Sequence, residues 1–189
     1  MYQGWKGWKA ALRLLRPRAV ALLLPFLVFA ADPREPEKDT TAMLQASYIY
    51  NIAKLVEWKD PSAKNGSFVI GVLGSTNLYQ ELLRKYSSRS VGKQPIEVLK
   101  LPRSTEIPPC HILFVSASEV ALMHGVIKAL EDRSTLLITE YPGALEDGAV
   151  VNFVRSQNTL KYEISLANAR KHKQEVGLTL KQMAENVIE

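Results

Sequence analysis

The chain has 189 residues, 47% of them hydrophobic, which is enough for one domain with a buried core. Its formal net charge of +5 raises the question of nucleic-acid binding. The excess is confined to the first 30 residues, which hold five cations and no acid, so that 19 of the 24 cations face 19 acids in the rest of the chain. This neutral remainder argues against a protein that binds phosphate backbones through a broad basic surface.

The first 30 residues have the pattern of a secretory signal peptide. A basic stretch precedes Ala19–Ala30, an apolar run of 12 residues that is too short to span a bilayer. Val28 and Ala30 are small residues at the two positions that a signal peptidase reads. We therefore expect cleavage after Ala30 and export to the periplasm, with an uncleaved membrane anchor as the alternative.

Two features define the start and the redox chemistry of the exported part. Residues 31–39 include a charged stretch with two prolines, which is typical of a disordered spacer before a folded domain at 40–189. Cys110 is the only cysteine, so an intrachain disulfide is excluded. It opens an apolar run, which indicates a small buried side chain at the start of a strand. A reactive thiol or an intersubunit disulfide is the alternative.

The first predicted element is an amphipathic helix from Thr40 to near Trp58, before Pro61. Asp39 or Thr40 can cap its first turn. Apolar residues at three- and four-residue spacing define its buried face: Leu44, Tyr48, Ile52, Leu55 and Val56.

Strands then alternate with helices. Short apolar runs predict four strands, at Phe68–Leu73, Ile96–Leu101, Ile112–Ala117 and Thr135–Thr139. Helices are expected between them, at Leu78–Tyr86 and Ala117–Leu130. Ser116 and Glu119 have the spacing of a capping box for the second helix. Such alternation is typical of a mostly parallel sheet with helices on both faces.

The last third of the chain has a different pattern. The runs Ala149–Val154 and Leu160–Leu166 flank Ser156–Asn158, and the second run alternates apolar and polar residues. This predicts an antiparallel hairpin at the edge of the sheet, with one face exposed to solvent. Ala167–Val187 is predicted to be helical, with a break at Gly177. The fold class is therefore α/β, a three-layer sandwich with an antiparallel edge hairpin.

The sequence carries no recognisable catalytic, metal or cofactor motif. His111, His124 and His172 lie in different predicted elements and lack further ligands at metal spacing. Nucleophile-elbow, Walker and dinucleotide-binding motifs are missing. We therefore predict a binding protein without metal or cofactor, in which each histidine is either hydrogen-bonded or exposed.

Polar residues gather where the predicted parallel strands end. In open α/β sheets, ligands bind outside the carboxyl ends of the strands. The segments there are rich in hydroxyl groups and poor in titratable ones, which suits hydrogen-bonded recognition better than acid–base catalysis. The alternative is that the hydroxyl groups only cap helices. The candidate ligand-binding residues are Ser75, Thr76, Asn77, Ser116, Ser118, Glu140 and Tyr141.

Five blocks of sequence resemble one known family. Tyr48–Trp58 (YIYNIAKLVEW) is similar to the helix that opens the YfiR-like family of periplasmic proteins. Four further blocks follow in the family's order, so the resemblance covers about 40–189. They are Ile70–Gly74, Cys110–Ser116, Asp147–Phe153 and Tyr162–Ile164, the last followed by Gly177, Leu178 and Ala184.

The resemblance implies a periplasmic regulator that works by protein–protein binding. It implies repression of a membrane-bound diguanylate cyclase, and hence lower cyclic di-GMP and less biofilm, until an envelope lipoprotein sequesters the regulator. A homodimer is compatible with this role. Trp58 closes the matching helix, and we expect its ring either in the core or, if exposed, as a partner contact.

A function of a different class also fits the residues. A periplasmic small-molecule-binding protein that serves a sensor kinase or a transporter would likewise need an exported α/β domain with polar strand ends. The two functions differ in what they bind, a cyclase or a small ligand.

Export gives the first testable prediction. N-terminal sequencing of the protein recovered from the bacterial envelope should begin at Ala31, because peptidase cleavage follows Ala30. A membrane-embedded product that still begins with Met1 would contradict cleavage and support the anchor.

Overall fold

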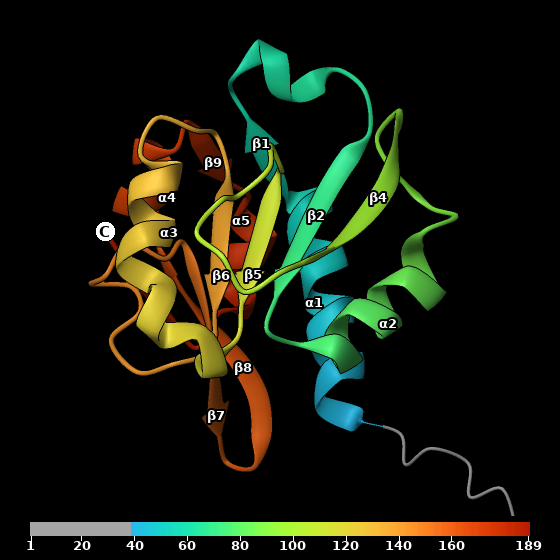
Figure 1. The fold of residues 1–189 in the computed structure, drawn as a ribbon. Coiled ribbons are helices and arrows are strands. Elements are labelled where there is room, and N and C mark those ends of the chain that lie inside the picture. Colours follow the sequence, from blue (N-terminus) through green and yellow to red (C-terminus); the bar gives the residue numbers. More distant parts are fainter. Residues whose placement is uncertain (1–38) are drawn as a thin grey trace, which may run out of the picture. The chain divides into compact units, whose positions relative to one another are not determined.

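The computed structural model describes residues 39–189 (Figure 1). Within them, an eight-stranded sheet and a small two-stranded sheet are packed with helices. The predicted signal peptide and residues 31–38 of the predicted spacer lie outside the described part of the chain. Those two predictions therefore stay untested.

The first helix, α1, runs from Thr40 to Leu55 and is capped by Asp39, whose Oδ1 accepts a hydrogen bond from Ala42 N at 3.0 Å. The predicted start is confirmed, but the predicted end near Trp58 is wrong. Residues Val56–Trp58 form strand β1, which pairs antiparallel with strand β9, Gln174–Val176. The pairing partner lies more than 100 residues away, so local periodicity could not reveal it.

Small residues set the buried face of α1. Leu44, predicted to be buried, is 41% exposed, and Tyr48 and Leu55 are half-buried. Alanines let the helix approach the sheet closely, which turns the larger residues to its flanks. The buried residues are Ala42, Gln45, Ala46, Ile49, Ile52 and Ala53.

The large sheet has the strand order β10-β8-β7-β6-β5-β2-β4-β3. Five of its seven strand pairs are parallel, and β7/β8 and β3/β4 are antiparallel. The mostly parallel sheet is thus confirmed. Its strands are β2 (Phe68–Leu73), β3 (Ser90–Val91), β4 (Gln94–Leu101), β5 (Ile112–Val115), β6 (Leu136–Thr139), β7 (Val151–Ser156), β8 (Thr159–Ser165) and β10 (Asn186–Ile188).

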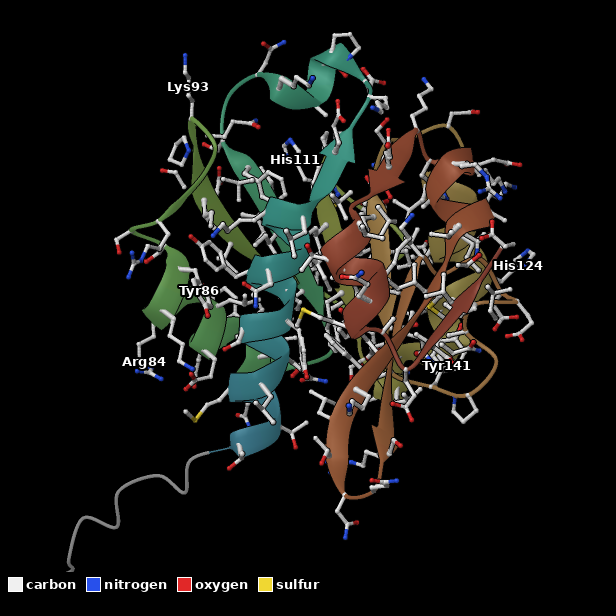
Figure 2. The ribbon with its side chains drawn as sticks, turned by 180° about the vertical axis from the view of Figure 1, so that it is seen from behind. Arg84, Tyr86, Lys93, His111, His124 and Tyr141 are labelled. Carbon is white, nitrogen blue, oxygen red and sulfur yellow. The ribbon has the colours of Figure 1, made fainter. Side chains whose placement is uncertain are left out.

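Side chains alternate between two cores, one on each face of the sheet. Ile112 and Phe114 of β5 pack with α1, α2 (Thr76–Tyr86) and α5 (Leu178–Met183). Leu113 and Val115 of the same strand pack with α3, Met123–Leu130, on the opposite face (Figures 1 and 2). This arrangement confirms the three-layer α/β sandwich.

The predicted hairpin is present as β7 and β8. Gln157 and Asn158 form its turn with φ values of 49° and 59°, a backbone geometry that matches the twist of the two strands. The hairpin does not form the edge of the sheet, however. Strand β10 adds in parallel to the outer side of β8, so the prediction of an edge position is wrong.

The C-terminal segment is not one interrupted helix. It forms α4 (Leu166–Lys171), β9, α5 and β10. Gly177 does mark a break, for a steric reason: a Cβ atom there would lie 2.6 Å from the carbonyl oxygen of Leu55. Its own N–H donates to that oxygen at 2.9 Å, so the close approach is part of the β1–β9 pairing.

Two short 3₁₀ helices complete the fold, η1 (Pro61–Lys64) and η2 (Ala117–Leu122). The second replaces the first turns of the helix predicted at Ala117–Leu130. The expected capping box is wrong, because Ser116 makes no side-chain capping bond to η2. Its hydroxyl instead donates to Glu140 from the neighbouring strand end.

Trp58 lies in the core, with 6% of its surface exposed. Its ring meets Phe68 edge-to-face at a centroid distance of 5.1 Å, and its Nε1–H donates to Ser134 O at 3.0 Å. Of the two expectations for Trp58, burial is the one observed, and a side chain this enclosed does not fit a surface contact.

Trp58→Ala should therefore lower the free energy of unfolding by about 3–5 kcal/mol, since it leaves a large cavity in the core. Chemical denaturation of the purified protein measures this. Trp58→Phe is the matched control, with a smaller expected loss of about 1–3 kcal/mol from the lost hydrogen bond to the Ser134 carbonyl and the smaller ring. An unchanged midpoint for Trp58→Ala would contradict the buried position.

Candidate functional site

The strand order places a topological switch point between β2 and β5. From β2 the chain crosses to β4 on one side, and it then returns to β5 on the other. Crevices at such points, outside the carboxyl ends of the strands, are the usual ligand sites of open α/β sheets. Residues 74–77 follow β2 and residues 116–119 follow β5, so the switch point coincides with the predicted binding residues.

Gly74 allows these two segments to approach each other closely. Its φ of +87° favours glycine, and a Cβ atom there would lie 2.5 Å from Glu119 Cγ and 3.0 Å from Ser118 Oγ. The close contact brings Ser116, Ser118 and Glu119 beside the end of β2. The structure thus joins the first two groups of predicted residues at one place.

Glu140, which follows β6, forms the centre of a hydrogen-bond network at this end of the sheet. Its Oε1 accepts from Ser116 Oγ at 2.8 Å and from Ala117 N at 3.2 Å. Its Oε2 accepts from Gln45 Nε2, on α1, at 2.7 Å. The carboxylate therefore ties two strand ends to the first helix, and Ser116 is 9% exposed within this network.

The residues after β2 serve mainly as caps. Ser75 Oγ accepts from Leu78 N at 3.3 Å and so caps α2. Asn77 Nδ2 donates to Asp39 Oδ2 at 2.9 Å, which links the starts of α1 and α2. The hydrogen bonds from Ala42 N and Asn77 lower the pKa of Asp39. Thr76 is exposed in the first turn.

Tyr141 is separated from that network and faces a cavity. Its hydroxyl donates to Asp147 Oδ2 at 2.9 Å. Burial raises the pKa of Tyr141 most, and this hydrogen bond raises it further. Its backbone N–H donates to Asn152 Oδ1 at 3.1 Å. Glu140, Tyr141 and Asn152 line a hollow of about 640 Å³ beside β7, β8 and β10. Two of the seven predicted residues therefore border a space of ligand size.

Two residues of this site were missed by sequence reasoning. Gln45 lies on the buried face of α1 with 3% exposure, and its signal was a polar residue at a helical position between Ala42 and Ile49. Glu119 is 8% exposed and lies 3.0 Å from Arg103 Nε, an ion pair that spacing cannot predict. Arg103 follows β4 and enters the site only through the sheet topology.

The arrangement suits hydrogen-bonded recognition. The carboxylate of Glu140 accepts from three donors, and the Ser116 hydroxyl is committed to it. Within residues 39–189, no group of three or more His, Cys, Asp or Glu side chains could hold a metal ion. Glu140 and Ser116 thus position the strand ends, whereas the exposed Thr76 and Asn77 present polar atoms at the surface.

The opposite end of the sheet carries His111, just before β5 (Figure 2). Its Nδ1 accepts from Val69 N at 3.0 Å, and Nε2 lies 2.7 Å from Ala63 O. This network assigns a neutral ring with the proton on Nε2. The ring also stacks on Phe68 at a centroid distance of 4.5 Å. Burial lowers the pKa of His111, against the opposing effect of the bond to Ala63.

The other predicted single residues behave as expected. His172 Nδ1 lies 2.8 Å from Arg133 O, and His124 is exposed. Cys110 is 9% exposed, and burial raises its pKa to about 11, so the thiol stays protonated at neutral pH. A protonated, enclosed thiol is a poor nucleophile, which agrees with a structural role.

Comparison with known proteins decides the family. The model of a family described as YfiR/HmsC-like matches residues 42–185, which is most of the chain. The chain belongs to the YfiR/HmsC-like family. The resemblance seen in the five sequence blocks is thus confirmed, and membership of this family supports the coarse role of a periplasmic regulator.

Solved structures show where the YfiR/HmsC-like fold recurs. A conserved domain protein from Vibrio cholerae matches with a TM-score of 0.53 at 13% identity, over 77% of this chain and 60% of the other. An ABC domain from Streptococcus pneumonia, solved in complex with L-Trp, matches with a TM-score of 0.50 at 13% identity, over 78% and 60%. The chain thus spans about 60% of each neighbour, and the likeness concerns the fold alone.

Two further comparisons concern sequence and membrane insertion. No curated protein matches the chain in sequence. Across residues 39–189, every helix is too short or too polar to cross a bilayer.

The neutral state of His111 predicts a pH-dependent stability. The pKa of His111 in the folded state lies below its ordinary value. Its full contribution to the free energy of unfolding is therefore present above about pH 6.5. As the pH falls below that value, the unfolded chain takes up the proton first and stability is lost until the folded state also protonates. The free energy of unfolding should therefore be lower at pH 5 than at pH 7.5.

The variant His111→Gln should reduce this difference, because glutamine does not titrate. His124→Gln provides the matched control, since His124 is exposed, and it should leave the pH dependence unchanged. Equal pH profiles for the native protein and His111→Gln would contradict a neutral, hydrogen-bonded His111.

Proposed function

We propose that this protein represses a membrane-bound diguanylate cyclase by direct binding, and so lowers cyclic di-GMP and biofilm formation. The observation that carries the proposal is the family match over residues 42–185. A repressor of this kind holds its target in an inactive conformation and acts stoichiometrically, because a binder shifts a two-state target only through its differential affinity for the two states.

The site geometry supports binding without turnover. Glu140 joins Gln45, Ser116 and Ala117 in bonds within the protein, so these groups rigidify the strand ends. A rigid surface loses little conformational entropy on association, which favours a protein partner. We further propose that an envelope lipoprotein relieves repression by sequestering the regulator, and that the regulator can form a homodimer.

A second candidate function is favoured by one observation. The hollow of about 640 Å³ beside Tyr141 has the size of a small-molecule site, and a neighbour in fold was solved with bound L-Trp. A periplasmic small-molecule-binding protein that serves a sensor kinase or a transporter would use this space. In that function we propose contacts by Glu140 and Tyr141 to a ligand in this hollow. Ser75, Thr76, Asn77, Ser116 and Ser118 do not line the hollow, and we propose that their hydroxyl and amide groups contact the part of a ligand that extends to the switch point.

Gene deletion tests the repressor. It should raise cyclic di-GMP and biofilm formation, and graded expression should lower cyclic di-GMP in a graded way, because stoichiometric restraint follows the amount of regulator. Cyclic di-GMP in cell extracts and crystal-violet staining of biofilm provide the measurements.

Two controls separate the candidate functions. Removal of the cyclase gene should abolish the effect of deletion, and a cytoplasmic version without residues 1–30 should fail to repress. If deletion changed nothing in a strain with an intact cyclase that has a periplasmic domain, or if the cytoplasmic version repressed fully, repression from the periplasm would be contradicted and ligand binding would be favoured.

A further inference from the structure

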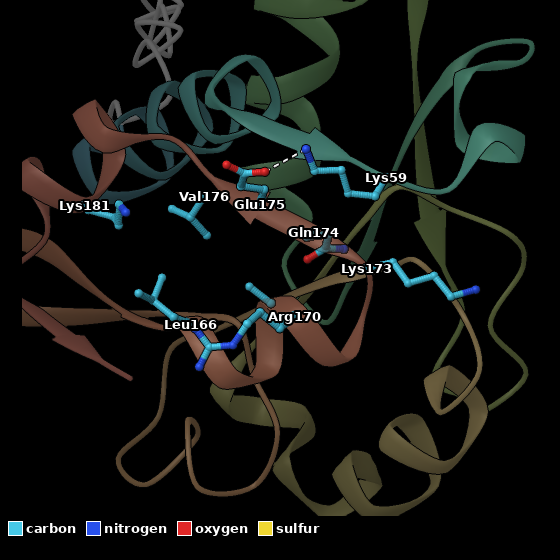
Figure 3. A pocket seen from close by; sticks show the side chains of 9 residues that line it. Lys59, Leu166, Arg170, Lys173, Gln174, Glu175, Val176 and Lys181 are labelled. Atoms are coloured by element: carbon cyan, nitrogen blue, oxygen red, sulfur yellow. Dashed lines mark ion pairs between the residues drawn. The ribbon is translucent and has the colours of Figure 1, made fainter.

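The small sheet β1–β9 borders a pocket that lies outside the switch-point site. The pocket has a volume of about 380 Å³ and is lined by α4, β9, α5 and the residue after β1 (Figure 3). Four of its lining residues are cations and one is an acid, which gives an excess of positive charge. The cations are Lys59, Arg170, Lys173 and Lys181, and the acid is Glu175.

The cations differ in how far they are already neutralised. Lys59 lies 2.6 Å from Glu175 and 2.8 Å from Glu57. Arg170 is 62% exposed and only loosely paired, at 3.7 Å from Glu189. Within residues 39–189, Lys181 is the lining cation without an ion pair. Arg170 and Lys181 therefore leave positive charge for an anionic group, since loose exposed ion pairs contribute little.

The floor of the pocket is apolar. Val176 and Ala169 are buried and Leu166 is half-buried. In Figure 3, Lys181 and Arg170 approach Val176 and Leu166 from two sides, whereas Lys173 extends away from them. An occupant that fills this space thus combines an anion with an aliphatic group.

Gln174 adds a third requirement. The whole residue is only 3% exposed, and its side-chain oxygen Oε1 is buried without a hydrogen-bond partner among the described residues. Nε2 donates a long hydrogen bond of 3.4 Å to Ser134 O, an acceptor that also receives Trp58 Nε1–H, and this bond assigns the orientation of the amide. The carbonyl oxygen lies on the other side of the amide, among the residues that line the pocket and just beneath its surface (Figure 3). An unpaired buried oxygen is costly and favours an incoming donor.

We propose that this pocket binds the C-terminal end of another polypeptide. A terminal aliphatic residue carries the three required features together: a carboxylate for Lys181 and Arg170, a peptide N–H for Gln174 Oε1, and a side chain for Val176 and Leu166. Phosphate groups lack the N–H donor. Among the described residues, strand β9 pairs only with β1, along one edge, so residues before the terminus can extend along its other edge.

Peptide titration tests the assignment on the whole purified protein. N-acetyl-Ala-Ala-Leu with a free carboxylate should bind at least about tenfold more tightly, by calorimetry, than its C-terminal amide, since the cations are then left without an anion. The single residue N-acetyl-leucine should bind more weakly than the tripeptide. Equal affinity for these two would overturn the chain terminus and assign the pocket to small acylated amino acids.

Variants locate the contacts. Lys181→Met should reduce the affinity for the acid peptide about tenfold and leave the amide peptide unaffected. Lys171→Met is the matched control, because Lys171 is exposed on the same helix as Arg170 but does not line this pocket, and it should change nothing. Equal losses in both variants would overturn the site in favour of general attraction by surface charge.

Gln174→Leu tests the donor requirement. It should weaken binding of the acid peptide but not of 4-methylpentanoate, which keeps the carboxylate and the aliphatic tail and lacks the N–H. Equal weakening of both would overturn the role of Gln174. Lys181 is only half-buried, so Lys181→Met keeps the proposal falsifiable if Gln174→Leu does not fold. These measurements are independent of cyclic di-GMP, so their failure would leave the repressor function standing.

Discussion

The antiparallel pairing of β1 with β9 joins the end of the first helix to the C-terminal segment, and much of the domain depends on it. It stops α1 at Leu55 and requires glycine at 177, because the Leu55 carbonyl approaches the Gly177 backbone. It also places the Trp58 ring against Phe68 and the Trp58 indole N–H within hydrogen-bond distance of Ser134 O. One long-range contact of three residue pairs thus seals a core that four helices share.

The two ends of the sheet have different chemical characters. At the amino end, His111 and Trp58 form hydrogen bonds with backbone groups of β2, η1 and the loop before β6, so polar side chains there serve stability. At the carboxyl end, Glu140 binds two strand ends and a helix together, and the neighbouring hollow beside Tyr141 stays open. A regulator benefits from this division, since a firm framework presents its binding surface without rearrangement.

The distribution of charge differs between two pockets of the domain. The residues after the first 30 are neutral as a whole, so local surfaces decide what is attracted. Around β9 the cations outnumber the acids, whereas Glu140, Glu146 and Glu163 line the hollow beside β7 and β8. The two regions therefore favour chemically different occupants.

The sequence by itself determined the elements whose pattern is local. The buried strands Phe68–Leu73 and Leu136–Thr139, the Asp39 cap and the hairpin turn at Gln157 and Asn158 follow from side-chain periodicity and backbone preference. Only the tertiary structure decided β1, β9 and β10, because three-residue strands carry no periodic signal and form when a distant segment supplies hydrogen bonds. The same holds for Gln45, Glu119 and Gln174, whose importance arises from neighbours that the chain brings together only on folding.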